Sequence, residues 1–316
     1  MEKKIIKVLS QNNLYDENEE IDIDKCNKLE QFFKRYHLNE SKKHFFPDNI
    51  SRDEKGRIIL DDIPFIVSNI DLKESNKNMH NDCKWLVLNN GTRLLLKEIK
   101  NNNYIENELL IMYFLKSLNM SCANYDIVTL NGKTYLASLS FLAYDEKIIH
   151  PFSNPKNIKI TYEECKKYGV DIHFLKTCVS DILDGNPDRA RNFPVITGGK
   201  VNNRNKQDRI CPLFDNGEYS LCEYDLYQFP YVDDALEDSK EKVINYLLNF
   251  EEVMHWLRGP VRKATLEACV KRLEKEKGVI LSNETYSGFE NYFKDSQQAI
   301  NDELKNKGES FRIKLV

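Results

Sequence analysis

Two short segments of this chain carry the residues best suited to chemistry. Residues 186–193 place Asp188 and Asn192 just before an apolar run, and residues 212–217 place Asp215 just after one. Carboxylate and amide oxygens are the ligands of a hard divalent cation and suit Mg²⁺ better than Zn²⁺. A magnesium site combined with a catalytic aspartate is the apparatus of phosphoryl transfer, so the two segments predict that chemistry.

Each of these residues has a role in such a reaction. Asp188 follows a predicted helix and could accept the proton of an attacking hydroxyl, or orient that hydroxyl. Asn192 and Asp215 would ligate the metal, with Asp215 bridging it to the nucleotide phosphates. Arg189 could orient the loop through a charged hydrogen bond, and Arg191 could do so instead, because nothing in the spacing separates them. Asp and Asn also favour ordinary turns, so the hypothesis depends on the whole set.

A lysine and a glutamate earlier in the chain could contact the phosphates. Lys97 ends a predicted strand just before a predicted helix, and Glu108 on that helix can reach back to it. A Lys–Glu pair of this kind fixes the ammonium for contact with phosphate. Glu106 competes for the role, but Glu108 is preferred because Met112 and Leu115 follow it at helical spacing and place it at the edge of the apolar face.

The composition is that of an ordinary soluble protein. The chain has 316 residues, of which 41% are hydrophobic and 30% charged, enough for one sound core and for two lobes. Its net charge of -4 argues against direct binding of nucleic acid. The absence of a long apolar run predicts no membrane span, and the short apolar start predicts no signal peptide, which favours a cytoplasmic protein. The scattered cysteines predict reduced thiols rather than zinc ligands or disulfides.

The type of predicted element changes along the chain. Strands, with hairpin turns at Asn-Asn-Gly and Asn-Gly, are predicted at 64–67, 84–88, 92–99, 125–130 and 134–142. Helices are predicted at 24–36, 104–118, 162–184, 239–258, 260–277 and 284–306. The sequence therefore predicts an α+β protein with an accessory segment at 1–60, a strand-rich lobe at 61–150 and a helical lobe at 151–316.

The two segments together resemble a known family. Asp-Arg with a nearby Asn-Phe, then Pro-Leu-Phe-Asp-Asn-Gly followed by Ser-Leu at 220–221, is similar to the HipA-like serine/threonine kinases, which are bacterial toxin and effector kinases. The resemblance covers about residues 61–260 and is strongest over 180–221. It implies a bilobal protein-kinase-like fold, related to phosphoinositide kinases, with ATP and Mg²⁺ as cofactors. The implied roles are Asp188 as catalytic base, Asn192 and Asp215 as metal ligands, Lys97 as the ATP lysine and Glu108 as its partner.

The sequence departs from the family pattern at two places. The usual pattern, Asp-Arg-His-x-x-Asn, has its asparagine five residues after the aspartate, whereas Asn192 follows Asp188 by four and Ala190 stands where histidine is expected. The stretch 68–84, which corresponds to the family's Gly- and Ser-rich phosphate loop, contains no glycine. Ser75 and nearby backbone amides would cradle phosphates there, and Ser75 is a candidate for autophosphorylation.

The resemblance also implies where the nucleotide base binds and what the enzyme acts on. The base would stack near residues 138–142, where Phe141 and Leu142 could line its pocket. The expected substrate is a protein, and an antitoxin or regulatory partner and translocation into a host cell are both compatible with the family. Two alternatives remain. The shortened Asp–Asn spacing and glycine-free loop fit a nucleotide-binding pseudokinase, and the related phosphoinositide kinases make a lipid or small-molecule kinase conceivable, although no basic amphipathic membrane face is present.

Overall fold

The computed structural model describes most of the chain beyond residue 50. The described residues are 51–60, 65–67, 83–88, 93–98, 102–142, 146–149, 161–186, 189, 192–198, 200–201, 204–205, 208–216 and 240–316. The predicted helix at 24–36 lies outside them. The chain forms two compact units: a strand unit of residues 1–101, 123–147 and 199–204, and a helical unit of residues 102–122, 148–198 and 205–316. The lobe boundaries at residues 60 and 150 stay predictions.

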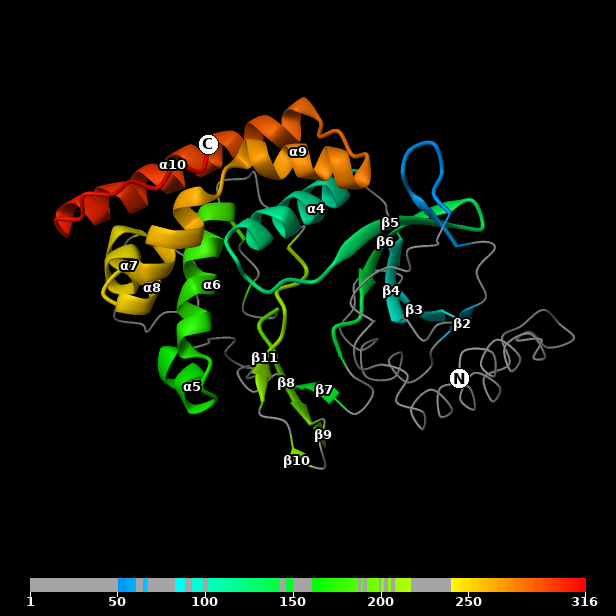
Figure 1. The fold of residues 1–316 in the computed structure, drawn as a ribbon, viewed down its shortest axis with the longest axis horizontal. Helices are drawn as coiled ribbons and strands as arrows, with labels where there is room; N and C mark the ends of the chain where they lie inside the picture. The colour runs from blue at the N-terminus through cyan, green and yellow to red at the C-terminus, as the bar shows by residue number, and fades with distance from the viewer. Residues whose placement is uncertain are drawn as a thin grey trace, which may run out of the picture. The chain divides into compact units, whose positions relative to one another are not determined.

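A six-stranded sheet makes up the described part of the strand unit (Figure 1). Its strand order is β1-β5-β6-β4-β3-β2. The strands are β1 (Ile58–Ile59), β2 (Phe65–Val67), β3 (Cys83–Leu88), β4 (Arg93–Glu98), β5 (Tyr125–Leu130) and β6 (Lys133–Leu139). Neighbours pair antiparallel except β1 and β5, which are parallel. Both predicted hairpins are confirmed, because β3 pairs with β4 and β5 pairs with β6.

One face of this sheet forms a hydrophobic core. In β4, Leu94 and Leu96 are fully buried, whereas Arg93, Leu95 and Lys97 are half-buried, as the two-residue period of a strand requires. The buried residues of this core are Ile58, Leu60, Leu86, Leu94, Leu96, Val128, Leu130, Tyr135, Ala137 and Leu139. The strand predicted at 92–99 therefore presents one buried face and one half-buried face.

Helices dominate the helical unit. They are α4 (Asn102–Ser117), α5 (Tyr162–Lys167), α6 (Asp171–Asp184), α7 (Lys240–Leu247), α8 (Glu251–Trp256), the π-helical turn η3 (Leu257–Val261), α9 (Leu266–Lys277) and α10 (Asn283–Asn306). Helix α4 is buried along residues 109–115, and α9 and α10 both pack on it (Figure 1). Helix α10 also packs on α6 and α7. A predicted α+β protein with a strand-rich and a helix-rich part is confirmed.

The remaining described strands form two small sheets. β8 (Val195–Gly198) pairs antiparallel with β11 (Arg209–Ile210), so that Ile196 lies opposite Arg209. β7 (Glu146–Ile149), where the chain passes from one unit to the other, completes this three-stranded sheet. β9 (Lys200–Val201) and β10 (Arg204–Asn205) form a two-stranded ribbon.

Three predicted helices are each divided in the structure. The helix predicted at 260–277 is interrupted at residues 264–265, and its predicted start lies inside η3. The helix predicted at 162–184 is interrupted after α5 by Gly169, whose φ of 66° is the left-handed conformation that ends helices. The helix predicted at 239–258 is interrupted between α7 and α8 at residues 248–250, where neither Gly nor Pro signals a break. Pro260 lies inside η3, since a π-helical turn accommodates a residue that lacks a backbone N–H.

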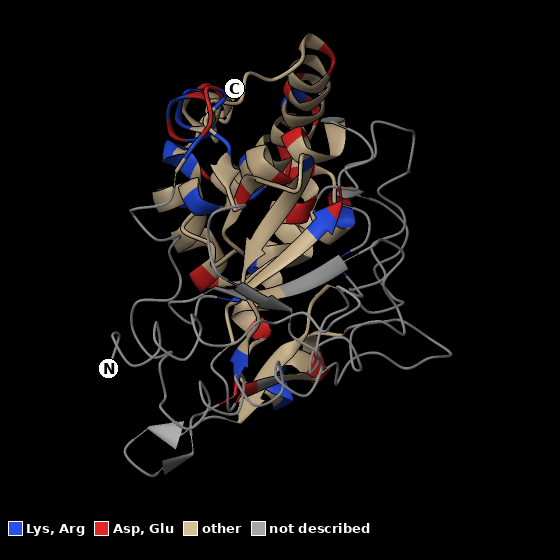
Figure 2. Cartoon of the chain, turned by 90° about the vertical axis from the view of Figure 1, so that its right-hand side faces the viewer, with Lys and Arg blue, Asp and Glu red and all other residues tan. Residues whose placement is uncertain are grey.

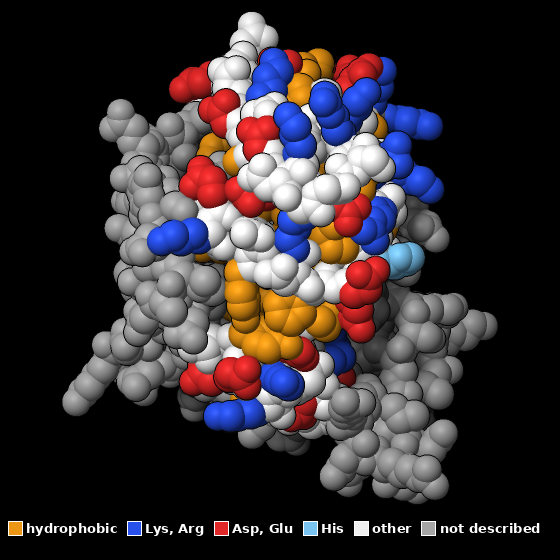
Figure 3. All heavy atoms as spheres, turned by 90° about the vertical axis from the view of Figure 1, so that its left-hand side faces the viewer, with side chains coloured by type: hydrophobic (Ala, Val, Ile, Leu, Met, Phe, Trp, Pro, Cys, Tyr) orange, Lys and Arg blue, Asp and Glu red, His pale blue; other side chains and the backbone are white. Residues whose placement is uncertain are grey.

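The surface carries charges of both signs. Figure 2 shows basic and acidic residues intermixed over the helices, while most residues of the described strands are neither basic nor acidic. In Figure 3, hydrophobic side chains gather on the face that carries α5, α7 and α8, where Phe250 contacts the rings of Tyr162 and Tyr246 at centroid distances of 5.1 and 5.7 Å. Within the described part of the chain, no helix is both long and apolar enough to cross a membrane.

The start of α10 provides a first testable prediction. The Ser282 hydroxyl accepts the N–H of Thr285 at 3.2 Å, and the Ser282 N–H donates to the Glu106 carboxylate at 2.9 Å. We expect Ser282→Ala to lower the free energy of unfolding by about 1 kcal/mol, because it removes the N-cap acceptor. Ser287→Ala, at an exposed interior position of the same helix, is the matched control. Urea unfolding followed by circular dichroism measures both, and equal losses would contradict the prediction.

Candidate functional site

The end of α6 sets the direction of the first candidate segment. Gly185 adopts a left-handed conformation with φ 74°, and its N–H donates to the Asp181 carbonyl at 2.8 Å. The N–H of Asn186 donates to the same carbonyl at 3.2 Å. These two bonds satisfy a carbonyl that the helix end would otherwise leave without a partner, and they turn the chain out of the helix at residue 186. The predicted stop at Gly185 is confirmed.

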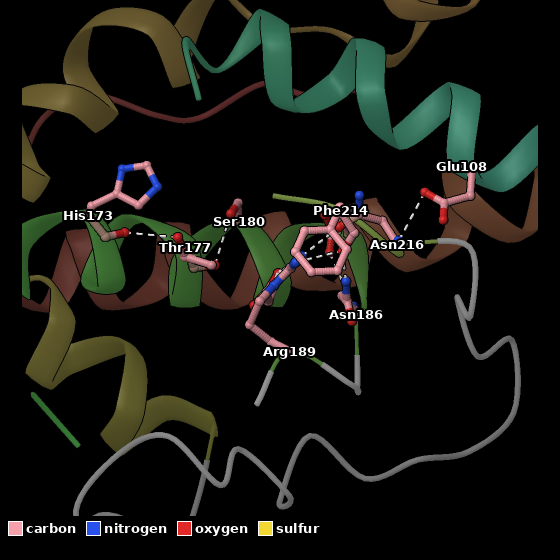
Figure 4. Close-up of polar contacts among 10 residues, drawn as sticks. Glu108, His173, Thr177, Ser180, Asn186, Arg189, Phe214 and Asn216 are labelled. Carbon is pink, nitrogen blue, oxygen red and sulfur yellow. Dashed lines mark hydrogen bonds and ion pairs between the residues drawn. The ribbon is translucent and has the colours of Figure 1, made fainter. Parts of the chain in front are cut away.

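Arg189 is a buried charge at the centre of the site (Figure 4). Its side chain is 1% exposed, and Asp181 on α6, which is 0% exposed, accepts hydrogen bonds from it. Arg189 Nε lies 3.2 and 3.1 Å from Asp181 Oδ1 and Oδ2, and Nη2 lies 2.9 Å from Oδ1. A bidentate Arg–carboxylate pair of this kind is strong and fixes the orientation of both groups.

The same guanidinium connects the two candidate segments. Arg189 Nη2 donates to Asn216 Oδ1 at 2.7 Å, and Nη1 donates to the Phe214 carbonyl at 3.4 Å. Asn186 Nδ2 also donates to Asn216 Oδ1, at 3.3 Å. Figure 4 shows these four residues converging beside the end of α6. The structure therefore brings together the segments at 186–192 and 212–216 that the sequence singled out.

Helix α4 fixes the second segment from its other side. Glu108, fully buried on α4, accepts the Asn216 N–H at Oε2 over 3.0 Å (Figure 4). The Tyr104 hydroxyl lies 2.9 Å from Asp215 Oδ1 and 3.2 Å from Glu108 Oε1. The N–H of Leu213 donates to the Ser121 carbonyl just after α4. These contacts hold the segment at three successive points before, at and after Asp215.

Asp215 has an unusual backbone conformation. Its φ is 57°, in the left-handed region that aspartate tolerates better than most residues other than glycine. The carboxylate is half-buried and is oriented by the Tyr104 hydroxyl. Because backbone strain of this kind is found at functional sites, the geometry is consistent with a role for Asp215 beyond that of a turn residue.

Electrostatics distinguish the two buried acids at the end of α6. Burial raises the pKa of Asp181, while the charge and hydrogen bonds of Arg189 oppose that shift. Burial, followed by the charge of Asp181, raises the pKa of Asp184 well above its ordinary value. Asp184 Oδ1 accepts the N–H of Asn186 at 3.1 Å, whereas Oδ2 is buried without a hydrogen-bond partner among the described residues. The Arg189 cation therefore favours the charged form of Asp181, whereas burial beside Asp181 favours the neutral form of Asp184.

The remaining predicted residues of the helical unit occupy different positions. Asn192 is 8% exposed, and its N–H donates to the Arg189 carbonyl at 2.8 Å, so the loop turns back on itself. Asp188 and Arg191 lie outside the described residues. Glu106 accepts from Ser282 at the start of α10, which leaves Glu108 as the acid that contacts the 212–216 segment.

The residues predicted to bind nucleotide belong to the strand unit. Lys97 lies on β4, and Phe141 and Leu142 follow β6, with the Leu142 carbonyl accepting from Arg93 Nη2 at 2.9 Å. Lys97 and Glu108 belong to different units, so their pairing stays a prediction. Ser75 lies outside the described residues.

The predicted magnesium ligands fit that metal by their chemistry. Among the described residues no group of three or more His, Cys, Asp or Glu side chains could hold a metal ion. Magnesium does not need such a group, because it keeps several waters and is commonly held by one or two carboxylates together with substrate phosphates. Asn192 and Asp215 both offer oxygen, and the orientation of the Asp215 carboxylate by Tyr104 is compatible with such a ligand.

The sequence prediction missed the residues that support the site. These are Tyr104, Asp181, Asn186 and Asn216. A signal for Asp181 was present, since Asp181 and Asp184 interrupt the apolar end of a predicted helix at a spacing of three residues. Charged residues are almost never fully buried without a partner, so two acids on such a face indicate a buried cation nearby.

His173 on α6 provides a prediction about pH. It stacks on Phe193 at 6.4 Å, its Nε2 is buried without a hydrogen-bond partner among the described residues, and burial lowers its pKa from 6.5 to about 4. As pH falls below about 6.5, the unfolded chain binds a proton that the folded protein does not. Folding stability should therefore decrease between about pH 6.5 and 4, by at most about 3 kcal/mol from this group.

Comparison with His173→Gln isolates this contribution. Urea unfolding at several pH values should show a weaker dependence on pH in the variant, because glutamine does not titrate. Identical pH dependence in both proteins would contradict the assignment of a neutral buried imidazole.

Comparisons with known proteins find likeness only among solved structures. No protein-family model and no curated protein matches the chain. It is similar to the Helicobacter pylori proinflammatory kinase CtkA, with 12% identity, a TM-score of 0.48, and coverage of 81% of this chain and 99% of that one. It is also similar to a chain of the Shewanella oneidensis MR-1 toxin–antitoxin complex of HipA, HipB and operator DNA, with 10% identity, a TM-score of 0.44, and coverage of 98% and 71%.

These values limit what the comparisons establish. At identities of 10–12% and TM-scores below 0.5, neither the activity nor the partners of those two proteins are transferred to this chain.

Proposed function

We propose that this chain is a Mg²⁺- and ATP-dependent serine/threonine protein kinase of the HipA-like type. One observation supports the proposal above others: Arg189 joins the segment that contains Asp188 to the segment that contains Asp215. A catalytic base and a metal ligand must be held in a fixed relation for phosphoryl transfer, because catalysis of this reaction is mostly positioning and electrostatic stabilisation.

The proposed mechanism gives each residue one task. Asp188 would accept the proton of the substrate hydroxyl as that oxygen attacks the γ-phosphorus, while the bond from the γ-phosphorus to the β–γ bridging oxygen breaks and ADP leaves. Asn192 and Asp215 would hold Mg²⁺, and Tyr104 and Glu108 keep the Asp215–Asn216 segment in place. When bound, the metal neutralises charge on the β- and γ-phosphate oxygens.

The strand unit would contribute nucleotide contacts to this mechanism. Lys97 would contact the phosphates with Glu108 as its partner, the 68–84 stretch with Ser75 would cover them, and Phe141 and Leu142 would line the pocket for the base. The base would lie against apolar side chains, as nucleotide bases commonly do in preformed pockets.

The same sequence resemblance suggests a biological setting. We propose a bacterial toxin or effector kinase that autophosphorylates and acts on a protein in the cytoplasm, or in a host cell if it is translocated, with an antitoxin or other regulatory protein as its partner. The near balance of charges, with a net charge of -4, fits a protein substrate better than nucleic acid.

A labelling experiment tests the proposal. Purified protein is incubated with γ-labelled ATP and either Mg²⁺ or EDTA, alone and with a bacterial lysate. We expect Mg²⁺-dependent label on the protein itself or on a lysate protein. Absence of label on both, together with a thermal shift by ATP that does not depend on Mg²⁺, would identify a nucleotide-binding pseudokinase instead. Label confined to a lipid extract or small molecule would identify the third class.

A further inference from the structure

The Asp181 carboxylate has a single kind of partner. Within the described part of the chain, the hydrogen bonds to its two oxygens all come from Arg189. The backbone carbonyl of Asp181, by contrast, accepts the two bonds that end α6. Because these bonds do not involve the side chain, the helix can end in the same way without the carboxylate. The carboxylate therefore acts on Arg189 and not on the helix.

Arg189 extends this influence to the second segment. Its Nη2 is shared between Asp181 Oδ1 at 2.9 Å and Asn216 Oδ1 at 2.7 Å. A guanidinium is a rigid, planar group, so fixing one edge of it against Asp181 fixes the direction in which the other nitrogens point. Asn216 follows Asp215 directly, and Arg189 follows Asp188 directly.

We infer that Asp181 is a positioning residue for phosphoryl transfer, whose carboxylate sets, through Arg189, the register between the Asp188 loop and the Asp215 segment. The inference rests on the proposed function, because phosphoryl transfer is the reaction that Asp181 would support. It goes beyond that function by assigning a role to a residue of α6 that contacts no substrate. Asp184, three residues along the same helix, has no such role, since its carboxyl group accepts only the N–H of Asn186 among the described contacts.

Two asparagine variants form a matched test. Asp181→Asn and Asp184→Asn change the same atom in equally buried side chains on one helix. Asp181→Asn removes the charge that orients Arg189, whereas Asp184→Asn replaces a carboxyl group whose neutral form is favoured by burial. A third protein, Asp181→Asn with Arg189→Met, removes both charges, so that neither is left buried without its counter-charge. This double variant keeps the test open if Asp181→Asn alone fails to fold.

Hydrogen exchange without nucleotide reports the register of the segments. In Asp181→Asn and in the double variant, we expect the amides of Asn192 and Asn216 to exchange at least about tenfold faster. Their acceptors are the Arg189 carbonyl in the loop and the Glu108 carboxylate on α4, so both hydrogen bonds weaken when the two segments lose their register. Amides of α10 should keep their wild-type rates, and Asp184→Asn should match the wild type throughout. Unchanged exchange at Asn192 and Asn216 in the folded double variant would overturn the inference.

Kinetics provide the second readout. We expect the double variant to transfer phosphate with a kcat lower by about 100-fold and a KM for ATP within about threefold of wild type, because misplaced catalytic groups slow the chemical step. A kcat equal to that of the wild type would also overturn the inference, as would an equal loss in Asp184→Asn. If the wild type itself transfers no phosphate, the proposed function is wrong, and the exchange pattern still decides whether Asp181 sets the register.

Discussion

Replacement of Asp188 by asparagine should lower the rate of phosphate transfer by about 10²–10⁴-fold. Asparagine has nearly the same shape as aspartate but cannot accept the proton of the attacking hydroxyl. Under the proposed function, binding of Mg²⁺ and ATP does not need this carboxylate. The initial rate of label transfer at saturating ATP measures the effect, and the thermal shift produced by Mg²⁺ and ATP shows whether binding is retained.

Asp215→Asn is the comparison that separates the two aspartates. This variant should lose both transfer and the Mg²⁺-dependent part of the thermal shift, since Asp215 is the proposed metal ligand. Asp188→Asn should lose only transfer. The assignment of roles is wrong if Asp188→Asn retains most of its rate, or if Asp215→Asn keeps a full response to Mg²⁺.

Replacement of Arg189 by methionine should lower the free energy of unfolding by about 3–5 kcal/mol. Methionine fills much of the same volume but leaves the Asp181 carboxylate, which is 0% exposed, without its partner. It also removes the donors to Asn216 Oδ1 and the Phe214 carbonyl. A loss of this size is a large fraction of the stability of a typical domain, so the midpoint of urea unfolding should fall markedly.

An exposed ion pair supplies the control for this effect. Lys294 lies 3.2 Å from Glu290 on α10, with side chains that are 54% and 31% exposed. Lys294→Met should cost no more than about 0.5 kcal/mol, because water and salt screen exposed pairs. If Arg189→Met were as mild as this control, the buried pair would not anchor the two segments, and the site as described would be wrong.

The sequence predicted the strand unit better than the helix boundaries, for a physical reason. The apolar runs on either side of a turn of Asn and Gly report the hairpin, and the two-residue period of a strand places Leu94 and Leu96 on one face, so both signals are local. Gly169 also carried a local signal, since glycine favours the left-handed conformation, yet the apolar period on either side favoured one continuous helix. The break at 248–250 contains no glycine or proline, and Phe250 there contacts the rings of Tyr162 on α5 and Tyr246 on α7.

The candidate site shows the same division between local and long-range information. Asp188, Asn192 and Asp215 could be selected because their types and order suit one kind of chemistry. The residues that hold them, such as Asp181 and Glu108, act across separations of 8 and 108 positions from their partners. Glu108 was selected as a partner for Lys97, and its hydrogen bond to the Asn216 N–H was not foreseen. Side-chain to backbone contacts of this kind leave no periodic pattern in a sequence.

The division of the chain into units has a consequence for how the protein is made. The backbone passes between the strand unit and the helical unit five times, after residues 101, 122, 147, 198 and 204. No contiguous fragment therefore consists of one unit alone, and a single cut cannot release one of them. The packing of α10 on α6 and α4 joins residues near the C-terminal end to residues synthesised far earlier. The buried Arg189 network needs less of the chain, because its last member in the sequence is Asn216, and it can close only after that residue has been synthesised.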